Sequence, residues 1–348
     1  MNTVCILFGG VSSEHDVSLR SAAAVLRNIP KAFKAEMLGI SKDGRWLRYT
    51  GGIEDIENGS WAGSPHTCPA VLSPDRKMGG LLLLEESGVR RIPVDLVFPV
   101  LHGKNGEDGT VQGLLELAGI PYVGCGVFSS ALCMDKAAAH IVLAAAGIPK
   151  TRLIALKPTD RADPAALEKR LAEALGYPMF LKPANAGSSV GVTRVKDASM
   201  LEDALDLAFL HDGKVVAERA VTGQEVECAV MGAGNPIASS VLGEIVPPDG
   251  VYDYESKYLN DTAGLYIPAH VPENIVSEIR ELAVRAYRAL DCRGLSRVDF
   301  FVTKEGRVIL NEVNTIPGFT SISMFPKLFE ASGMSFTALV EKLLLSAL

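Results

Sequence analysis

The sequence contains no Cys-x-x-Cys pair, which excludes the usual ligand spacing of a structural zinc site. Its six cysteines are scattered along 348 residues: Cys5, Cys68, Cys125, Cys133, Cys228 and Cys292. Scattered cysteines of this kind are typical of reduced thiols. We therefore expect a cytoplasmic protein without a zinc centre.

Long apolar runs are also missing. No stretch approaches the ~18 uninterrupted apolar residues of a membrane-spanning helix, because Gly, Pro or a charge breaks each run. The N-terminus, MNTVCILFGG, has no basic segment and no small-residue cleavage site, so it predicts a first strand and not a signal peptide. We expect no membrane partner.

An excess of positive charge is absent as well. The formal net charge of -7 would repel polyphosphate, which argues against nucleic acid and anionic membrane surfaces as partners. A small anionic ligand needs only local positive charge. Apolar material, in contrast, is ample at 48%, and a chain of this length predicts two or three domains.

The first third of the chain alternates between strand and helix patterns. Helical patterns such as 16–29 and 110–120 separate short apolar strands, which is typical of a parallel α/β sheet. Residues 50–80 are rich in Gly, Ser and Pro, and we expect a surface excursion there. The pattern predicts an N-terminal α/β domain, Rossmann-like, over residues 1–126.

The character of the sequence changes after a helix that ends at Gly147. Short strand patterns follow at 177–184, 190–195, 214–221, 225–232, 296–303 and 307–314. With helical patterns such as 273–290 between them, they predict antiparallel hairpins covered by helices, an α+β arrangement. We assign 127–222 and 223–348 to two further domains. Residues 247–268 lack a period and carry four of the eight tyrosines, so we expect a lid.

Two strand patterns near the C-terminus flank a candidate two-residue turn at Glu305–Gly306. Such a turn places Asp299 opposite Glu312 and Arg297 opposite Asn314, with all four side chains on one face. The apolar residues then point to the other face: Val298, Phe300, Val302, Ile309 and Val313. Facing carboxylates repel unless a cation lies between them, and Asp, Glu and Asn oxygens are ligands that Mg²⁺ prefers. The alternative is a solvated outer face with Arg297 in salt bridges.

The stretch 180–195, FLKPANAGSSVGVTRV, contains a Gly-x-Ser-x-Gly pattern centred on Ser189. A serine nucleophile of that type needs a helix directly after it, but the residues that follow alternate as a strand. Glycines and serines between two strands can instead present backbone N–H groups to phosphate. Lys182, at the end of the entering strand, would add a positive charge.

The first glycine-rich loop, LFGGVSSE, ends at Glu14 and precedes a helix. It could be read as a dinucleotide site with Glu36 as the ribose acid, but the third glycine of that fingerprint is missing. Glu14 would also repel a pyrophosphate. An acid at this place suits a cationic ammonium better, so a substrate site is our preferred interpretation. The alternative is an acid that only favours the helix N-terminus.

Together these motifs resemble the ATP-grasp superfamily and, more narrowly, the D-alanine–D-alanine ligase family. The resemblance covers nearly the whole chain. Its segments are GGVSSEHDVSLRSAAAV (9–25), HGKNGEDGTVQGLLELAGIPYVGCG (102–126), ALCMDK (131–136), KPANAGSSVGV (182–192), YDYESKY (252–258), SRVDFF (296–301) and NEVNTIPGFTSISMFP (311–326). The resemblance implies that residues 127–348 form a two-lobed ATP-grasp fold with antiparallel sheets.

The same resemblance implies roles in nucleotide and metal binding. Lys136 and Lys182 match residues that hold the ATP phosphates. Adenine and ribose would be held by Glu218, the backbone near Val221, and Glu225. The family's magnesium ligands, for Mg²⁺ or Mn²⁺, match Asp299, Glu312 and Asn314, in agreement with the hairpin argument.

It also implies roles for residues around the substrate. Glu14 matches the acid that binds the ammonium group of the first substrate, and Ser188 and Tyr258 match its hydrogen-bonded partners. Arg297 and the backbone of Gly318 match groups that stabilise an oxyanion. Residues that contact the substrate or the transferring phosphate in the family match His102, Lys257, Ser323 and Met324.

The activity that the resemblance implies is ATP-dependent joining of two D-alanine molecules through a D-alanyl phosphate, which supplies D-alanyl-D-alanine for peptidoglycan synthesis. It also implies a homodimer. Within the family, a D-alanine–D-serine ligase of the vancomycin-resistance type is the alternative, although the apolar Met324 stands where those enzymes tend to have a basic residue. Lys257 and Tyr258 argue against a D-lactate-adding enzyme. Outside the family, a serine hydrolase that uses Ser189 and a non-catalytic ATP-binding sensor stay open.

Overall fold

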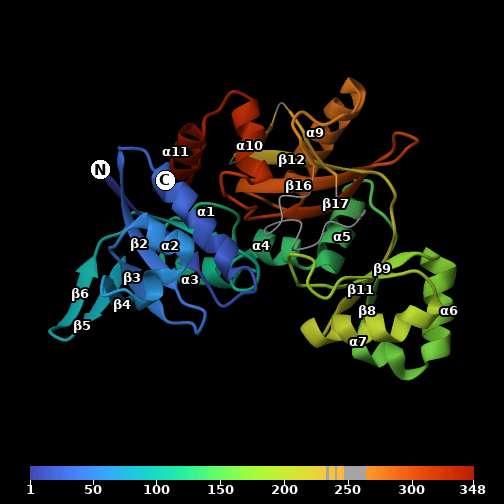
Figure 1. The fold of residues 1–348 in the computed structure, drawn as a ribbon, viewed down its shortest axis with the longest axis horizontal. Coiled ribbons are helices and arrows are strands. Elements are labelled where there is room, and N and C mark those ends of the chain that lie inside the picture. The colour runs from blue at the N-terminus through green and yellow to red at the C-terminus, as the bar shows by residue number, and fades with distance from the viewer. Residues whose placement is uncertain (233–234, 240, 247–263) are drawn as a thin grey trace.

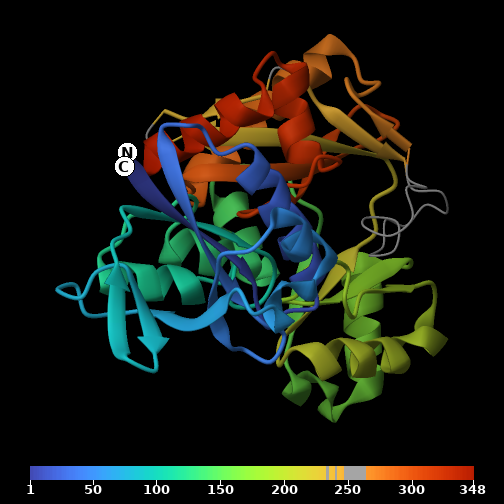
Figure 2. The same ribbon diagram turned by 60° about the vertical axis from the view of Figure 1, so that its left-hand side comes forward.

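The computed structural model describes residues 1–232, 235–239, 241–246 and 264–348. Three β-sheets organise this part of the chain. Figure 1 shows the N-terminal sheet in blue and teal, the sheet of the C-terminal part in orange, and a third, yellow-green body that lies below the orange sheet. The two chain ends lie close together in both Figure 1 and Figure 2.

The first sheet has seven strands in the order β6-β5-β4-β3-β2-β1-β7. These are β1 (Asn2–Gly9), β2 (Phe33–Ile40), β3 (Trp46–Tyr49), β4 (Thr67–Leu72), β5 (Leu81–Glu85), β6 (Gly88–Ile92) and β7 (Leu96–Leu101). Helices α1 (His15–Arg27), α2 (Ile53–Asn58), η1 (Ser60–Gly63) and α3 (Thr110–Ala118) accompany it. The predicted parallel pairing is confirmed for β1 with β2 and β7.

The other pairs of this sheet are antiparallel, from β2–β3 to β5–β6. The reason is the short connection after β2, where the Ser41 N–H donates to the Arg45 carbonyl and closes a hairpin. A parallel neighbour needs a crossover of a dozen or more residues, and α1 and the segment before β7 supply the long connections. The predicted parallel sheet is therefore right only at its centre.

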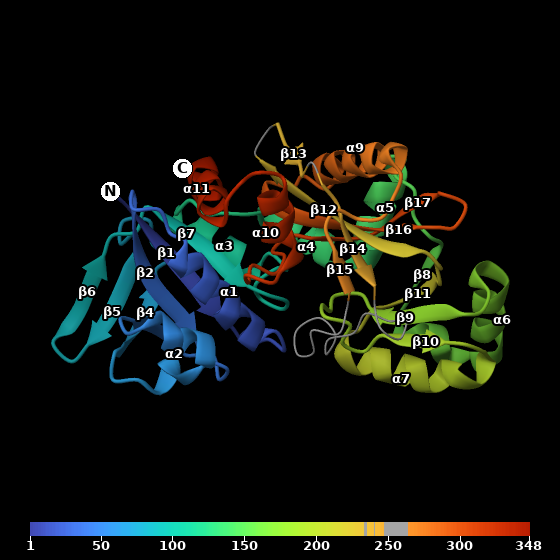
Figure 3. The same cartoon turned by 45° about the horizontal axis from the view of Figure 1, so that its top comes forward.

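The second sheet has the order β10-β9-β11-β8 and is antiparallel throughout. Its strands are β8 (Leu153–Leu156), β9 (Met179–Pro183), β10 (Thr193–Val195) and β11 (Val215–Arg219). Helices α6 (Pro164–Leu175) and α7 (Leu201–His211), with the short turns η2 (Pro158–Ala162) and η3 (Ala198–Met200), belong to this body. Figure 3 shows α7 on the side of the second sheet that faces away from the third sheet, and α6 beside the second sheet. Both helices contribute to the hydrophobic core of this body.

The third sheet has the order β15-β14-β12-β16-β17, and β13 also pairs with β12. Its strands are β12 (Gln224–Gly232), β13 (Ile237–Ala238), β14 (Gly243–Val246), β15 (Gly264–Tyr266), β16 (Gly294–Val302) and β17 (Val308–Asn314). All described pairs are antiparallel. The antiparallel hairpins that the sequence predicts for the second part of the chain are confirmed.

Helices cover the third sheet from different parts of the chain: α4 (Val127–Met134), α5 (Lys136–Ala145), α9 (Glu273–Ala289), α10 (Met324–Ala331) and α11 (Phe336–Ala347). The chain passes from the second sheet to the third between β11 and β12, but α4 and α5 pack with α9 on the third sheet although they precede β8.

In the described ranges no single helix is long and apolar enough to cross a membrane. Helices α4 and α5, which meet at an angle of 103°, reach the length and apolar composition of a membrane span only when they are counted together. The predicted domain boundaries stay a prediction.

Phe319 joins the N-terminal sheet and the C-terminal helices in one hydrophobic core. Its ring centroid lies 5.9 Å from that of Phe98 on β7, 5.6 Å from Phe325 on α10 and 5.4 Å from Phe336 on α11. The Phe319 N–H also donates to the Ser21 hydroxyl of α1 at 3.2 Å. The N-terminal sheet and the C-terminal helices are therefore held together directly beside the loop that carries Gly318.

The predicted surface excursion over residues 50–80 is only partly right. This segment includes α2, η1 and β4, and it buries the Trp61 side chain to 1% exposure. The Trp61 ring packs edge-on against Phe8 on β1, with centroids 5.0 Å apart. Gly39 on β2 leaves the space that the indole ring fills, because a Cβ there would lie 2.2 Å from Trp61 Cη2. The burial of Trp61 thus packs this segment, whose sequence shows only a weak pattern, against the first sheet.

We predict that Gly39→Ala destabilises the protein because the added methyl group overlaps the buried indole. Overpacking of this kind costs roughly 1–3 kcal/mol, visible as a lower midpoint in chemical denaturation followed by Trp fluorescence. Gly213→Ala is the matched control, since a Cβ there meets no atom within 4 Å. Equal midpoints for the two variants would contradict the packing role of Trp61.

Candidate active site

A cavity of about 410 Å³ lies where the three sheets meet. Every predicted site residue that the structure describes lines it: Glu14, His102, Lys136, Lys182, Ser188, Glu218, Val221, Glu225, Arg297, Asp299, Glu312, Asn314, Gly318, Ser323 and Met324. Tyr258 and Lys257 lie outside the described residues, as does the predicted lid except for its last part, 264–268. The specific ligand contacts of these residues stay a prediction.

The glycine- and serine-rich loop connects β9 to β10, and these strands pair in an antiparallel hairpin with Thr193 opposite Leu181. No helix follows Ser189, so the strand–turn–helix geometry of a serine nucleophile is absent from this loop. Ser188 and Ser189 adopt positive φ angles of 48° and 59°. Two successive left-handed residues are costly for non-glycine side chains, and such curled backbone is typical of anion-binding loops.

Two lysines lie beside this loop. Lys136, the first residue of α5, donates from Nζ to the Ala186 carbonyl at 2.6 Å. Lys182 on β9 forms an ion pair with Glu218 on β11, with Nζ and Oε2 2.6 Å apart. The two strands pair so that both side chains reach the same face of the sheet. The loop backbone and two cationic groups thus converge on one part of the cavity.

The Lys182–Glu218 pair is charged because its members stabilise each other. Burial alone would lower the pKa of Lys182, but Glu218, together with Glu312 and Glu225, outweighs that effect and the pKa is raised. Burial alone would likewise raise the pKa of Glu218, but Lys182 and Lys150 lower it. A buried ion pair of this kind is broken only at a large cost when one partner is removed. Both groups are therefore charged near neutral pH.

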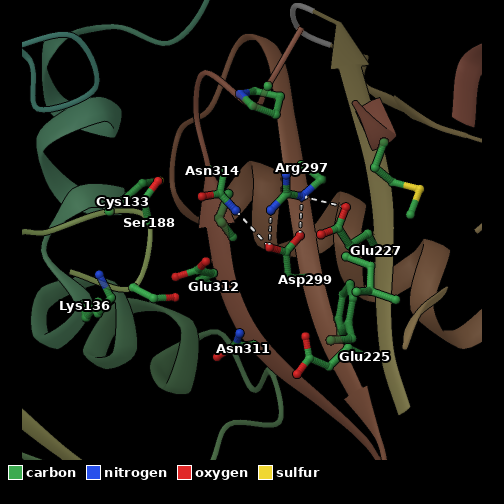
Figure 4. Close-up of a pocket in the computed structure, with 18 of the residues that line it drawn as sticks. Cys133, Lys136, Ser188, Glu225, Glu227, Arg297, Asp299, Asn311, Glu312 and Asn314 are labelled. Atoms are coloured by element: carbon green, nitrogen blue, oxygen red, sulfur yellow. Dashed lines mark hydrogen bonds and ion pairs between the residues drawn. The ribbon is translucent and has the colours of Figure 1, made fainter. Parts of the chain in front are cut away.

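The β16–β17 hairpin brings the predicted metal ligands together. Arg297 pairs with Asn314 and Asp299 with Glu312, as the sequence predicts. Figure 4 shows Glu312 directed toward the side where Ser188 and Lys136 lie, and Arg297 and Asp299 together nearer to Glu227. Two facing acids and an amide therefore line the cavity from a single supersecondary element.

The predicted two-residue turn, however, is wrong. Val302 pairs with Val308, and Gly306 adopts φ 75° in the longer turn between them. The turn shifts the register by one residue, and a bulge between Asp299 and Phe300 shifts it back. In consequence Ile309 was wrongly predicted to face the core. The residues of β17 in the core are Val308, Leu310 and Val313.

The Asp299 carboxylate is held by its neighbours. Arg297 donates from Nε and Nη2 to its two oxygens at 2.8 and 2.7 Å, and the Asn314 amide donates at 3.0 Å. Arg297 also forms an ion pair with Glu227 at 2.9 Å, as the dashed lines of Figure 4 show. Glu227 lies opposite Asp299 on β12. It is not among the residues predicted from the sequence, although it is a lone acid within the apolar run VECAV.

The donor set fits a hard cation such as Mg²⁺. Asp299, Glu312 and Asn314 offer carboxylate and amide oxygens, the ligands that Mg²⁺ selects, usually with water and phosphate completing its shell. Within the described residues no group of three or more His, Cys, Asp or Glu side chains is arranged to hold a metal ion alone. Water and the phosphates of a bound nucleotide would complete the coordination of a cation held by these three side chains.

Glu14 forms an acidic end of the cavity. The Ser188 hydroxyl donates to Glu14 Oε1, which joins the N-terminal sheet to the β9–β10 loop. Two glycines allow this close approach: a Cβ at Gly103 or Gly187 would lie 2.5 or 2.8 Å from Glu14 Oε2. Glu14 is only 6% exposed. A buried carboxylate with the Ser188 hydroxyl beside it could hold an ammonium group.

Glu107 and His102 lie behind Glu14. Burial, together with the charge of Glu14, raises the pKa of Glu107 to about 8, so this carboxyl is mostly neutral at pH 7. The Gly103 and Ile316 N–H groups donate to it at 3.0 and 3.3 Å. Burial also lowers the pKa of His102. Glu107 is not among the residues predicted from the sequence, where its signal is an acid in the glycine-rich run after β7.

The segment before α10 lines the cavity next to His102. His102 Nδ1 lies 3.0 Å from the Ile316 carbonyl oxygen, and Ser323 Oγ accepts from the Thr320 N–H at 3.0 Å. A Cβ at Gly318 would lie 2.9 Å from Ser323 Oγ. Met324 begins α10 and is buried at 6% exposure. This wall therefore offers backbone groups beside a small apolar surface.

Comparison with known proteins agrees with this geometry. Family models described as the N-terminus and C-terminus of D-ala D-ala ligase match residues 3–125 and 142–345. D-alanine–D-alanine ligases of Caldicellulosiruptor bescii and Acetivibrio thermocellus are 47% and 48% identical, over 98% of this chain and 93% and 94% of theirs.

Solved structures give the same result. The VanG D-Ala:D-Ser ligase of Enterococcus faecalis is 44% identical with a TM-score of 0.90, covering 100% of this chain and 99% of that one. The D-alanine–D-alanine ligase of Coxiella burnetii is 34% identical with a TM-score of 0.86, covering 100% and 95%. With matches along nearly its whole length, the chain belongs to the D-alanine–D-alanine ligase family.

Proposed function

We propose that this chain is an ATP-dependent D-alanine–D-alanine ligase that works in the cytoplasm as a homodimer with Mg²⁺ or Mn²⁺, and supplies D-alanyl-D-alanine for peptidoglycan synthesis. One observation carries the proposal. A single cavity combines an acidic end at Glu14, cationic groups at Lys136 and Lys182, and facing acids at Asp299 and Glu312. These are the groups that an amino acid's ammonium, a nucleotide's phosphates and a divalent cation require.

The first step activates a carboxylate. The first D-alanine, held through its ammonium by Glu14, attacks the γ-phosphate of ATP with its carboxylate, which gives D-alanyl phosphate and ADP. Lys136 and Lys182 lie where they would hold phosphate oxygens, and the curled Ser188–Ser189 backbone adds N–H donors. A bound Mg²⁺ or Mn²⁺ would neutralise charge on the phosphates.

The second step forms the peptide bond. The free amine of the second D-alanine attacks the carbonyl carbon of the acyl phosphate, and inorganic phosphate leaves. Arg297 and the backbone N–H of Gly318 are the groups that we assign to the developing oxyanion. Acyl phosphates hydrolyse readily, so water must be excluded from the cavity during both steps.

A D-alanine–D-serine ligase is the second candidate, because one of the solved relatives carries that activity in its name. Met324 decides between the two in our proposal. Its buried side chain offers an apolar wall, which favours a methyl group over a hydroxymethyl group. The preference that one hydroxyl creates in an apolar pocket is limited, at about a hundredfold or less.

We predict that phosphate release from Mg-ATP requires a D-amino acid and that D-alanine alone is sufficient. D-Serine as second substrate should react roughly ten- to a hundredfold more slowly, and D-lactate should not react. The measurement is phosphate release with each compound or none, with the dipeptide identified by mass spectrometry. Release without any D-amino acid, or no release with all of them, would contradict the ligase assignment.

Ser188→Ala should weaken D-alanine binding because it removes the hydroxyl that orients Glu14. A hydrogen bond to a charged group contributes about 1.5–3 kcal/mol, so the KM for D-alanine should rise roughly ten- to a hundredfold. Ser189→Ala is the comparison variant, since it removes a neighbouring hydroxyl and leaves the Ser188 hydroxyl that contacts Glu14 in place. The opposite pattern, with activity lost only in Ser189→Ala and no need for ATP, would indicate a serine hydrolase.

Asp299→Asn should lower turnover at least about a hundredfold, since an amide replaces one of two cation-binding carboxylates. Asp203→Asn, on the surface helix α7, should leave turnover unchanged. Both rates are measured at increasing Mg²⁺, and chelation by EDTA should abolish the wild-type rate. An Asp299→Asn enzyme with wild-type turnover and Mg²⁺ dependence would refute the metal assignment.

A further inference from the structure

A one-residue bulge decides which side chains of β17 face the cavity. Asp299 pairs with Glu312, but Phe300 pairs with Leu310, so Asn311 is an extra residue in the ladder. If Asn311 took a regular position, it would lie opposite Asp299, and Glu312 would turn toward the hydrophobic core. Instead both Asn311 and Glu312 line the cavity (Figure 4). The bulge is therefore a condition for the candidate metal site.

Lys150 reaches this bulge from the segment between α5 and β8. Its Nζ donates to the carbonyl oxygen of Asn311. The preceding residue also contacts β17, because the Leu310 N–H donates to the Pro149 carbonyl at 2.9 Å, and Lys150 forms a parallel bridge with Leu310. Since β17 ends the strand order of its sheet, residues 149 and 150 hold its outer edge at the bulge.

The charges around Lys150 come from both parts of the candidate site. Glu218 and Glu312 attract its ammonium group, and Lys182 and Lys136 repel it. Its ammonium group is thus influenced both by the lysines proposed to hold the nucleotide and by Glu312, a proposed metal ligand. A cation at this place offsets part of the repulsion between acids on the two sheets and at the same time satisfies the backbone of the bulge.

We propose that Lys150 is a positioning residue for the nucleotide and metal site. Its ammonium group fixes the bulge at Asn311, and the bulge directs the Glu312 carboxylate into the cavity. The inference rests on the proposed function of the cavity. Lys150 acts through the backbone of Asn311, so its loss should weaken Mg-nucleotide binding without removing any group that contacts the substrates.

The test compares Lys150→Met and Lys150→Arg with the wild-type protein. Lys169→Met, on the exposed face of α6, is the matched control. Calorimetric titration with Mg-ADP should show a Kd about tenfold higher for Lys150→Met, the loss expected for one hydrogen bond from a charged group. Lys150→Arg should recover most of the affinity, and the concentration of Mg²⁺ that half-saturates turnover should shift in the same order.

An unchanged Kd for Mg-ADP in Lys150→Met would overturn the inference. So would a lower thermal unfolding midpoint with an unchanged Kd, because that result identifies a purely structural lysine. If Lys150→Met does not fold, Lys150→Gln keeps a neutral donor and gives the same comparison. A wild-type protein without D-alanine-dependent phosphate release would contradict the proposed function, a result separate from the binding comparison.

Discussion

The repulsion among acids in one cavity is the constraint on which the site depends. Among the described residues, the lining contains seven carboxyl groups and four Lys or Arg side chains. Burial reduces this excess of negative charge, because it raises the pKa of Glu107 to about 8 and keeps that carboxyl group mostly neutral at pH 7. Ion pairs such as Lys182–Glu218 moderate it further. The negative charge that remains in the cavity favours the binding of cations, and the proposed reaction brings two of them, an ammonium group and a divalent metal ion. The anionic phosphates can then bind together with the metal ion, which neutralises part of their charge.

The polypeptide satisfies this constraint by close approach of backbone rather than by flexible side chains. Gly103 and Gly187 let Glu14 come near two loops that belong to different sheets. The bulge at Asn311 lets two successive residues of β17 line the same cavity. In each case the charged group is placed by backbone geometry, which loses little conformational entropy when a ligand binds. Preorganisation of this kind is what phosphoryl transfer requires, because the protein contributes chiefly position and charge.

Local patterns predicted the local parts of this structure well. Alternation in β16 and β17, counted from an assumed two-residue turn, placed Asp299 opposite Glu312 and Arg297 opposite Asn314 correctly, although that turn is wrong. It failed for Ile309, because a longer turn and a bulge cancel near the site but not near the turn, and a pattern of period two contains neither. The cover formed by Trp61 and the roles of Glu107 and Glu227 depend on partners far away in the sequence, namely Gly39, Ile316 and Arg297, which no local pattern contains. The antiparallel half of the first sheet has a local cause, the short connection after β2, which the prediction from strand–helix alternation did not include.

The aromatic cluster around Phe319 has a consequence for modularity. Two family models divide the chain after residue 125, which invites the view that the halves are exchangeable parts. Yet α10 and α11, from the very end of the chain, share one hydrophobic core with β1 and β7. A hybrid that took its first half from a relative would place a foreign sheet against native C-terminal helices, beside the loop that carries Gly318. Recombination at that sequence boundary would therefore preserve each motif and still mismatch the surface on which the motifs are aligned.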